Sequence, residues 1–151
     1  RTSSGVARAT VVERMSTLES LAAAADVVSL HTPLNASTRG LVGEAFFAAA
    51  RRGSTLVNTA RGAVVDMPAL LAALDAGILR GAALDVLPIE PVPGDSPLRS
   101  DPRVILSPHA AFYSVEAEQE LRRKAAQNIV SWLARGRPDY PVVEGTRKHP
   151  A

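Results

Sequence analysis

Short apolar runs and helical patterns alternate along most of this chain. Runs rich in Val, Ile and Leu are typical of buried strands, and they predict strands at residues 9–12, 26–31, 55–58, 81–86 and 104–106. Between them, apolar residues at helical spacing predict helices at residues 17–24, 44–50 and 66–76. The segment at 87–97 is too rich in proline to be helical. This alternation predicts an α/β fold, a parallel sheet with flanking helices and right-handed crossovers.

Capping and terminating residues mark the ends of two of these helices. Ser16 or Thr17 can cap the first helix by accepting a hydrogen bond from a free backbone N–H group. Asp66 can cap the helix at 66–76 in the same way, and Pro68 falls in its first turn, where a missing N–H costs nothing. Gly77 follows that helix and predicts its end.

The longest helical pattern lies near the carboxyl end, at residues 114 to about 133. Its apolar positions predict an amphipathic helix lying on the sheet, and they are Val115, Leu121, Ala125, Ile129, Trp132 and Leu133. Gly136 and Pro138 end this pattern. We therefore predict one domain at residues 1–136 and an extended tail at 137–151.

Composition narrows the classes of function. A chain of 151 residues with 46% hydrophobic and 21% charged residues is typical of one globular domain. The net charge is only +2 and the arginines are scattered, so we expect no nucleic-acid partner. The lack of cysteine excludes disulfides and thiolate chemistry, fits a reducing compartment and leads us to expect a cytoplasmic protein. With no apolar stretch of ~18 residues and no secretory signal, we expect no membrane role.

Three residues with chemical potential follow the ends of predicted strands. Arg61 follows the strand at 55–58, Glu90 follows the strand at 81–86, and His109 follows the strand at 104–106. Parallel strands bring their carboxyl ends to one edge of a sheet, with neighbours ~4.8 Å apart. Taken singly, the three could be a surface salt-bridge arginine, a solvated loop acid and a helix-entry histidine. Taken together, they predict one site that combines a guanidinium, a carboxylate and an imidazole, without a metal.

The ordered motifs that hold these residues resemble the D-isomer-specific 2-hydroxyacid dehydrogenases over about residues 16–143. The motifs are Asn58-Thr59-Ala60-Arg61-Gly62, then Gly81-Ala82-Ala83-Leu84-Asp85-Val86 with Glu90-Pro91, then Ser107-Pro108-His109-Ala110-Ala111. The resemblance implies a dinucleotide-binding domain of Rossmann type and hydride transfer between a nicotinamide cofactor and a small D-2-hydroxy or 2-keto acid. It implies that Arg61 holds the substrate, that His109 exchanges a proton with it, and that Glu90 steadies His109.

The same resemblance implies which residues contact the cofactor, NAD with NADP not excluded. Besides Arg61 and His109, the implied set is Thr32, Pro33, Leu34 and Thr38 at the ribose and phosphates, Thr59 and Ala60 at the nicotinamide ribose, and Asp85 at the carboxamide. A simpler interpretation makes Thr32-Pro33 a strand terminator and Asp85 a capping acid. His31 fits a satisfied strand-end residue better than a catalyst.

Two departures from the family pattern limit these expectations. No Gly-x-Gly-x-x-Gly occurs, so the first βαβ unit is missing, and we expect a carboxyl-terminal fragment that binds cofactor weakly and does not turn over. The full-length protein would then be the enzyme, and the resemblance implies a homodimer. An aromatic residue at Phe112 resembles the C-terminal-binding-protein corepressors, so a dinucleotide-sensing interaction module is the alternative function. A defunct fragment, the choice of substrate and the choice between NAD and NADP also stay open.

Overall fold

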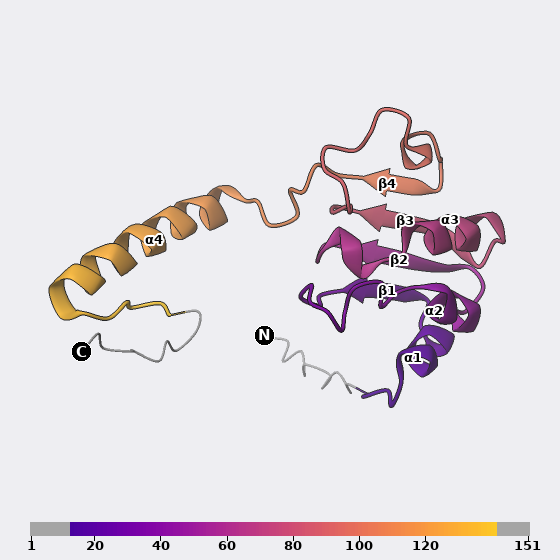
Figure 1. The fold of residues 1–151 in the computed structure, drawn as a ribbon, viewed down its shortest axis with the longest axis horizontal. Coiled ribbons are helices and arrows are strands. Elements are labelled where there is room, and N and C mark those ends of the chain that lie inside the picture. The colour runs from indigo at the N-terminus through magenta and orange to yellow at the C-terminus, as the bar shows by residue number, and fades with distance from the viewer. Residues whose placement is uncertain (1–12, 142–151) are drawn as a thin grey trace, which may run out of the picture. The chain divides into compact units, whose positions relative to one another are not determined.

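The four strands in the described part of this protein form one parallel sheet (Figure 1). The computed structural model describes residues 13–141, and the strand predicted at residues 9–12 lies outside them. The strands are β1 (Val27–Leu30), β2 (Ser54–Asn58), β3 (Leu79–Leu84) and β4 (Val104–Leu106), and they pair in chain order. All four carboxyl ends therefore share one edge, which confirms the predicted α/β fold of Rossmann type.

Three short helices supply the apolar side chains that cover one face of this sheet. They are α1 (Leu18–Ala24), α2 (Glu44–Ala49) and α3 (Met67–Asp75). Thr17 caps α1, where its hydroxyl accepts from the backbone N–H of Ser20 at 3.0 Å. Asp66 caps α3 by accepting from Ala69 N–H at 3.0 Å, as predicted. Both helices begin where the capping residues place them.

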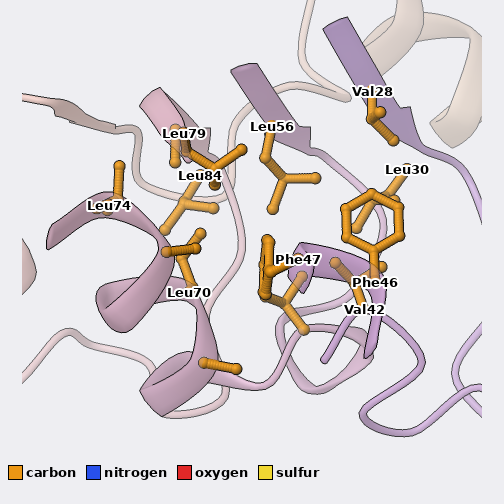
Figure 2. Packing of buried hydrophobic residues seen from close by; sticks show 14 of the residues in the cluster. Val28, Leu30, Val42, Phe46, Phe47, Leu56, Leu70, Leu74, Leu79 and Leu84 are labelled. Atoms are coloured by element: carbon orange, nitrogen blue, oxygen red, sulfur yellow. The ribbon is translucent and has the colours of Figure 1, made fainter. Parts of the chain in front are cut away.

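The hydrophobic core lies between these helices and the sheet. Figure 2 shows side chains of the strands facing those of α2 and α3, among them Leu56, Phe46 and Leu70. Phe46 packs edge to face on Phe47, with ring centroids 5.4 Å apart. Alternate strand residues point to the opposite face, where Ile105 is 70% exposed. Only one face of the described sheet is therefore fully covered within residues 13–109.

Two predicted boundaries near the site differ from the structure. β3 begins at Leu79, two residues before the predicted start, because Gly77 (φ 63°) turns the chain directly from α3 toward the strand. β3 also ends at Leu84, two residues before the predicted end, so Asp85 and Val86 lie just after the strand, at the carboxyl edge. Residues 87–96 of the proline-rich segment hold no helix, as predicted, and a 3-10 turn at Pro97–Arg99 begins at its last residue, because proline at the first position needs no N–H partner.

Residues 110–141 belong to a second compact unit. Its helix α4 (Val115–Arg135) is capped by Ser114 and ends at Gly136 in the left-handed conformation (φ 66°). Asp139 accepts a hydrogen bond from Ser131 Oγ at 2.6 Å, so the residues that follow α4 bond back to it. The placement of α4 on the sheet and the domain boundary after residue 136 stay predictions. No helix among residues 13–141 is long and apolar enough to cross a membrane.

Candidate active site

The loop after β2 presents Arg61 at the carboxyl edge of the sheet. Asn58, the last residue of β2, is fully buried, and its side chain closes the turn that follows. Its Oδ1 accepts from Ala60 N–H at 3.0 Å, and its Nδ2 donates to the Arg61 carbonyl at 3.1 Å. The exposed Arg61 side chain donates to the Ala60 carbonyl at 2.6 Å. The backbone of the arginine loop is therefore fixed by a buried amide.

Gly62 brings this loop into contact with the loop after β3. A Cβ atom at Gly62 would overlap the backbone carbonyl of Leu87 and the nitrogen of Pro88. Because these are backbone atoms, no side-chain rotation could relieve the overlap. Glycine at this position therefore permits a close approach of two loops, one carrying Arg61 and the other carrying Glu90.

Glu90 and His109 form a hydrogen-bonded pair. The distance from His109 Nδ1 to Glu90 Oε2 is 2.9 Å, and Glu90 Oε1 accepts from Leu87 N–H at 2.8 Å. The Leu87 N–H is the largest cause of a pKa of Glu90 below its ordinary value, followed by the hydrogen bond with His109, while burial and Asp85 oppose them. The side chains of His109 and Glu90 are 45% and 38% exposed, so solvent and small molecules can reach the pair.

The backbone of His109 is held in an uncommon conformation. Its φ of 55° lies in the left-handed region, which histidine tolerates better than most residues. His109 N–H donates to the Asp85 carbonyl at 3.0 Å, and the buried Asp85 side chain accepts from Ser107 Oγ at 2.5 Å. The loop after β4 is thus tied to the residue that follows β3, which orients the imidazole.

The structure brings the three predicted catalytic residues into one pocket. Arg61, Glu90 and His109 line a hollow of about 220 Å³ together with Leu34 and Gly62. An adjoining hollow of about 440 Å³ shares Leu34 and Arg61 with it and is lined further by His31, Thr32, Pro33, Thr59 and Ala60. A third, of about 570 Å³, is lined by Asp85, Ser107, Pro108 and His109, among others. Apart from Thr38, the predicted cofactor residues thus line these hollows, and their roles stay predictions.

Thr38 is placed differently from the other predicted cofactor residues. Its side chain is buried, and its hydroxyl donates to the Pro33 carbonyl at 2.6 Å. The same oxygen accepts from Asn35 N–H at 2.9 Å. Thr38 therefore holds the loop that contains Pro33 and Leu34, and its direct contact with a cofactor stays a prediction. His31 is hydrogen-bonded to Ser29 Oγ through Nε2 at 2.9 Å.

Two contributors to the site received no role from the sequence. Ser107 bonds to Asp85, and Asn58 fixes the arginine loop, although both belong to the motifs that carry the resemblance. A polar residue at the last position of a buried strand was the available signal for Asn58. In the described range, 13–141, no group of three or more His, Cys, Asp or Glu side chains is arranged to hold a metal ion.

Comparison with known proteins places this site in a family. Residues 1–111 match the model of the D-isomer specific 2-hydroxyacid dehydrogenase, NAD binding domain. The chain is 41% identical over 116 residues to a glyoxylate reductase of Thermofilum pendens, which covers 77% of this chain and 34% of the relative. It is also 41% identical over 149 residues to the D-3-phosphoglycerate dehydrogenase of Haemophilus influenzae, with 90% and 36% covered.

A solved structure agrees with these relatives. A D-isomer specific 2-hydroxyacid dehydrogenase from Xanthobacter autotrophicus Py2, in complex with NADPH and MES, superimposes with a TM-score of 0.71 at 36% identity. The match covers 80% of this chain and 49% of that one. This chain spans about a third of the length of the two curated relatives, 34% and 36%. The match over residues 1–111 shows that the chain belongs to the D-isomer specific 2-hydroxyacid dehydrogenase family, within its NAD-binding domain.

Proposed function

We propose that this chain is part of an NAD(P)-dependent dehydrogenase that interconverts a small D-2-hydroxy acid and its 2-keto acid. The pocket that Arg61, Glu90 and His109 share is the observation that carries this proposal. A cation for the substrate carboxylate and an imidazole with a carboxylate partner are the groups that this reaction requires. The names of the relatives, glyoxylate reductase and D-3-phosphoglycerate dehydrogenase, describe enzymes that act on small acids and support it.

Arg61 binds and orients the substrate in this proposal. Its guanidinium is planar and permanently charged, so it can donate two parallel hydrogen bonds to a carboxylate. In the structure the guanidinium donates to the Ala60 carbonyl at the wall of the pocket. A substrate carboxylate would compete with that neutral acceptor and offers the stronger, charge-assisted hydrogen bond. The remaining donors of the guanidinium could then polarise the keto oxygen.

His109 exchanges a proton with the substrate oxygen. Nδ1 of His109 lies 2.9 Å from Glu90 Oε2 and is engaged by it. We therefore assign the proton exchange with the substrate to Nε2. During reduction the protonated imidazole donates its proton to the keto oxygen. During oxidation of the hydroxy acid, the neutral imidazole takes the hydroxyl proton. Glu90 is itself held by Leu87 N–H, which keeps its second oxygen directed at His109.

The residues around the pocket fit a nicotinamide cofactor, which supplies or accepts the hydride when bound. The buried Asp85 carboxylate lines the hollow beside His109 and could accept from a carboxamide N–H group. The hydroxyls of Thr32 and Thr59 line the opposite side and suit ribose or phosphate oxygens. The glycine-rich phosphate loop of such domains does not occur in the sequence. We therefore expect these residues to bind NADH weakly on their own.

We infer a homodimer in the cytoplasm, which acts on a free small acid and requires neither nucleic acid nor a membrane. The dehydrogenase is favoured over the corepressor alternative because all three chemical residues are present and share a pocket. A protein that only senses a dinucleotide has no need of a paired imidazole and a substrate-binding guanidinium.

The test compares the 151-residue chain with the full-length product of its gene. NADH oxidation is followed by absorbance with glyoxylate and a panel of other small 2-keto acids, and the assay is repeated with NADPH. The full-length protein should turn over, whereas the 151-residue chain should show only weak NADH binding by fluorescence. A full-length protein that binds NADH tightly but reduces no 2-keto acid supports the corepressor alternative. Turnover by the 151-residue chain alone refutes its dependence on the rest of the protein.

A further inference from the structure

A polar residue occupies a position of the sheet that otherwise belongs to leucine. The register pairs the last residue of each strand, so Asn58 lies in one row with Leu30, Leu84 and Leu106. Asn58 is 0% exposed, and its neighbours Leu30 and Leu84 are buried on the same face. An apolar side chain would suit this position, because burying an amide costs free energy unless both of its ends are hydrogen-bonded.

Both ends of the Asn58 amide bond to the loop that presents Arg61. The two partners are the Ala60 N–H, at 3.0 Å, and the Arg61 carbonyl, at 3.1 Å. The amide thus clamps the backbone on each side of the Arg61 α-carbon. Neither hydrogen bond contributes to pairing between strands, so the benefit of this buried amide is confined to the arginine loop.

A second contact fixes the arginine loop against the acid loop. Gly62 follows Arg61 and packs on the backbone of Leu87 so closely that no Cβ atom fits. Leu87 N–H holds Glu90 Oε1 at 2.8 Å, and Glu90 Oε2 lies 2.9 Å from His109 Nδ1. A continuous series of contacts therefore runs from the arginine loop to the imidazole.

We propose that Asn58 and Gly62 are positioning residues that hold the Arg61 guanidinium at a fixed separation from the Glu90–His109 pair. The meaning of this separation for catalysis rests on the proposed function, since it would match the distance between the carboxylate and the reacting oxygen of the acid. The geometric part can be tested without substrate or cofactor. Both residues act through others and contact no reactant themselves.

The first experiment measures the titration of Glu90 by carbon NMR in the 151-residue chain. Gly62→Ala should push Leu87 away, weaken its hydrogen bond and raise the pKa of Glu90 toward its ordinary value. The charged groups that act on this carboxylate are His109 and Asp85, and the substitution changes neither. Gly81→Ala is the matched control, because a Cβ at Gly81 would also meet a backbone atom, the Arg103 carbonyl at 2.8 Å, but away from the site.

The second experiment removes the amide in the full-length protein. Asn58→Ala should lower kcat/KM for glyoxylate by about 10²-fold, since an error of about 1 Å in placing a reactive group has effects of that size. Most of the loss should appear in KM for the acid, while the Kd for NADH changes little. Ser54→Ala, at the buried first residue of the same strand, is the control and should leave kcat/KM unchanged.

The outcomes separate this proposal from the proposed function. A folded Gly62→Ala chain whose Glu90 titrates as in wild type overturns the positioning role of Gly62, and an unchanged KM overturns that of Asn58. If Gly62→Ala does not fold, Asn58→Ala tests whether the arginine loop is held in place. In that variant the amide proton of Ala60 should exchange with solvent faster than in wild type. If the wild-type protein reduces no acid, the dehydrogenase proposal fails, while the Glu90 titration and the amide exchange still decide the geometry.

Discussion

Replacing Glu90 by glutamine tests the pairing of acid and imidazole most directly. The carboxylate now accepts from Leu87 N–H at 2.8 Å and lies 2.9 Å from His109 Nδ1. Glutamine has the same shape but one acceptor oxygen, so one of these two partners would face an amide NH₂ group instead. The substitution also removes the negative charge beside the imidazole. We expect the variant to stay folded and the rate of proton exchange with the substrate to fall.

The size of the effect follows from the geometry and the exposure of the pair. Hydrogen bonds to charged groups contribute about 1.5–3 kcal/mol when shielded from water. With side chains 45% and 38% exposed, solvent screening lowers this to about 1 kcal/mol. Since each 1.36 kcal/mol corresponds to a factor of ten in rate, the loss of this hydrogen bond should lower kcat/KM for glyoxylate about fivefold.

The assay is the rate of NADH oxidation with glyoxylate by the full-length protein across the neutral pH range. Glu44→Gln serves as the control, because Glu44 is an exposed acid at the start of α2, outside the pocket. A Glu90→Gln variant whose kcat/KM equals or exceeds that of wild type contradicts the assignment of Glu90 as the partner of His109. An equal loss of kcat/KM in both variants points to a general charge effect instead.

Three further predictions concern substrate binding, the core and acid stability. Arg61→Lys should raise KM for the 2-keto acid at least tenfold with little change in the Kd for NADH, measured by steady-state kinetics and fluorescence, because an ammonium cannot make the bidentate contact. Leu56→Ala should lower the free energy of unfolding by about 2–5 kcal/mol in urea titrations, since Leu56 is 0% exposed in the core. Hydrogen bonds from the Arg103 side chain and N–H lower the pKa of Asp101 from 3.8 to about 2, so this pair stabilises the fold above pH 3.8 and loses its effect as the pH falls to about 2. The stability difference between wild type and Asp101→Asn should therefore shrink over that pH interval.

Local sequence signals were sufficient for most of the fold. Thr17 and Asp66 cap their helices as predicted, because N-cap hydrogen bonds involve residues only a few positions apart. The strand order follows from the rule that βαβ connections place parallel strands side by side. The meeting of Arg61 with His109 in one pocket follows from the same rule, since both residues come after strands of one sheet.

These local signals could not predict contacts between loops that are distant in the sequence. The approach of Gly62 to Leu87 depends on the heights of two loops above the sheet, which neither segment encodes alone. The local hydrogen bond from the Thr38 hydroxyl to the Pro33 carbonyl was not predicted either, because a threonine can bond within its own loop or to a ligand, and its expected contact with a cofactor stays a prediction. The shift of β3 by two residues arose from a glycine turn that leads into the strand without a linker.

The left-handed backbone at His109 has a consequence for alanine scanning. With a φ of 55°, this position disfavours any residue with a Cβ atom except those, such as asparagine, that tolerate the conformation. His109→Ala would therefore remove the imidazole and also strain the turn, so its defect would mix two causes. His109→Asn keeps the turn and isolates the chemical loss, and only a comparison of both variants tells how much of the phenotype is due to the ring.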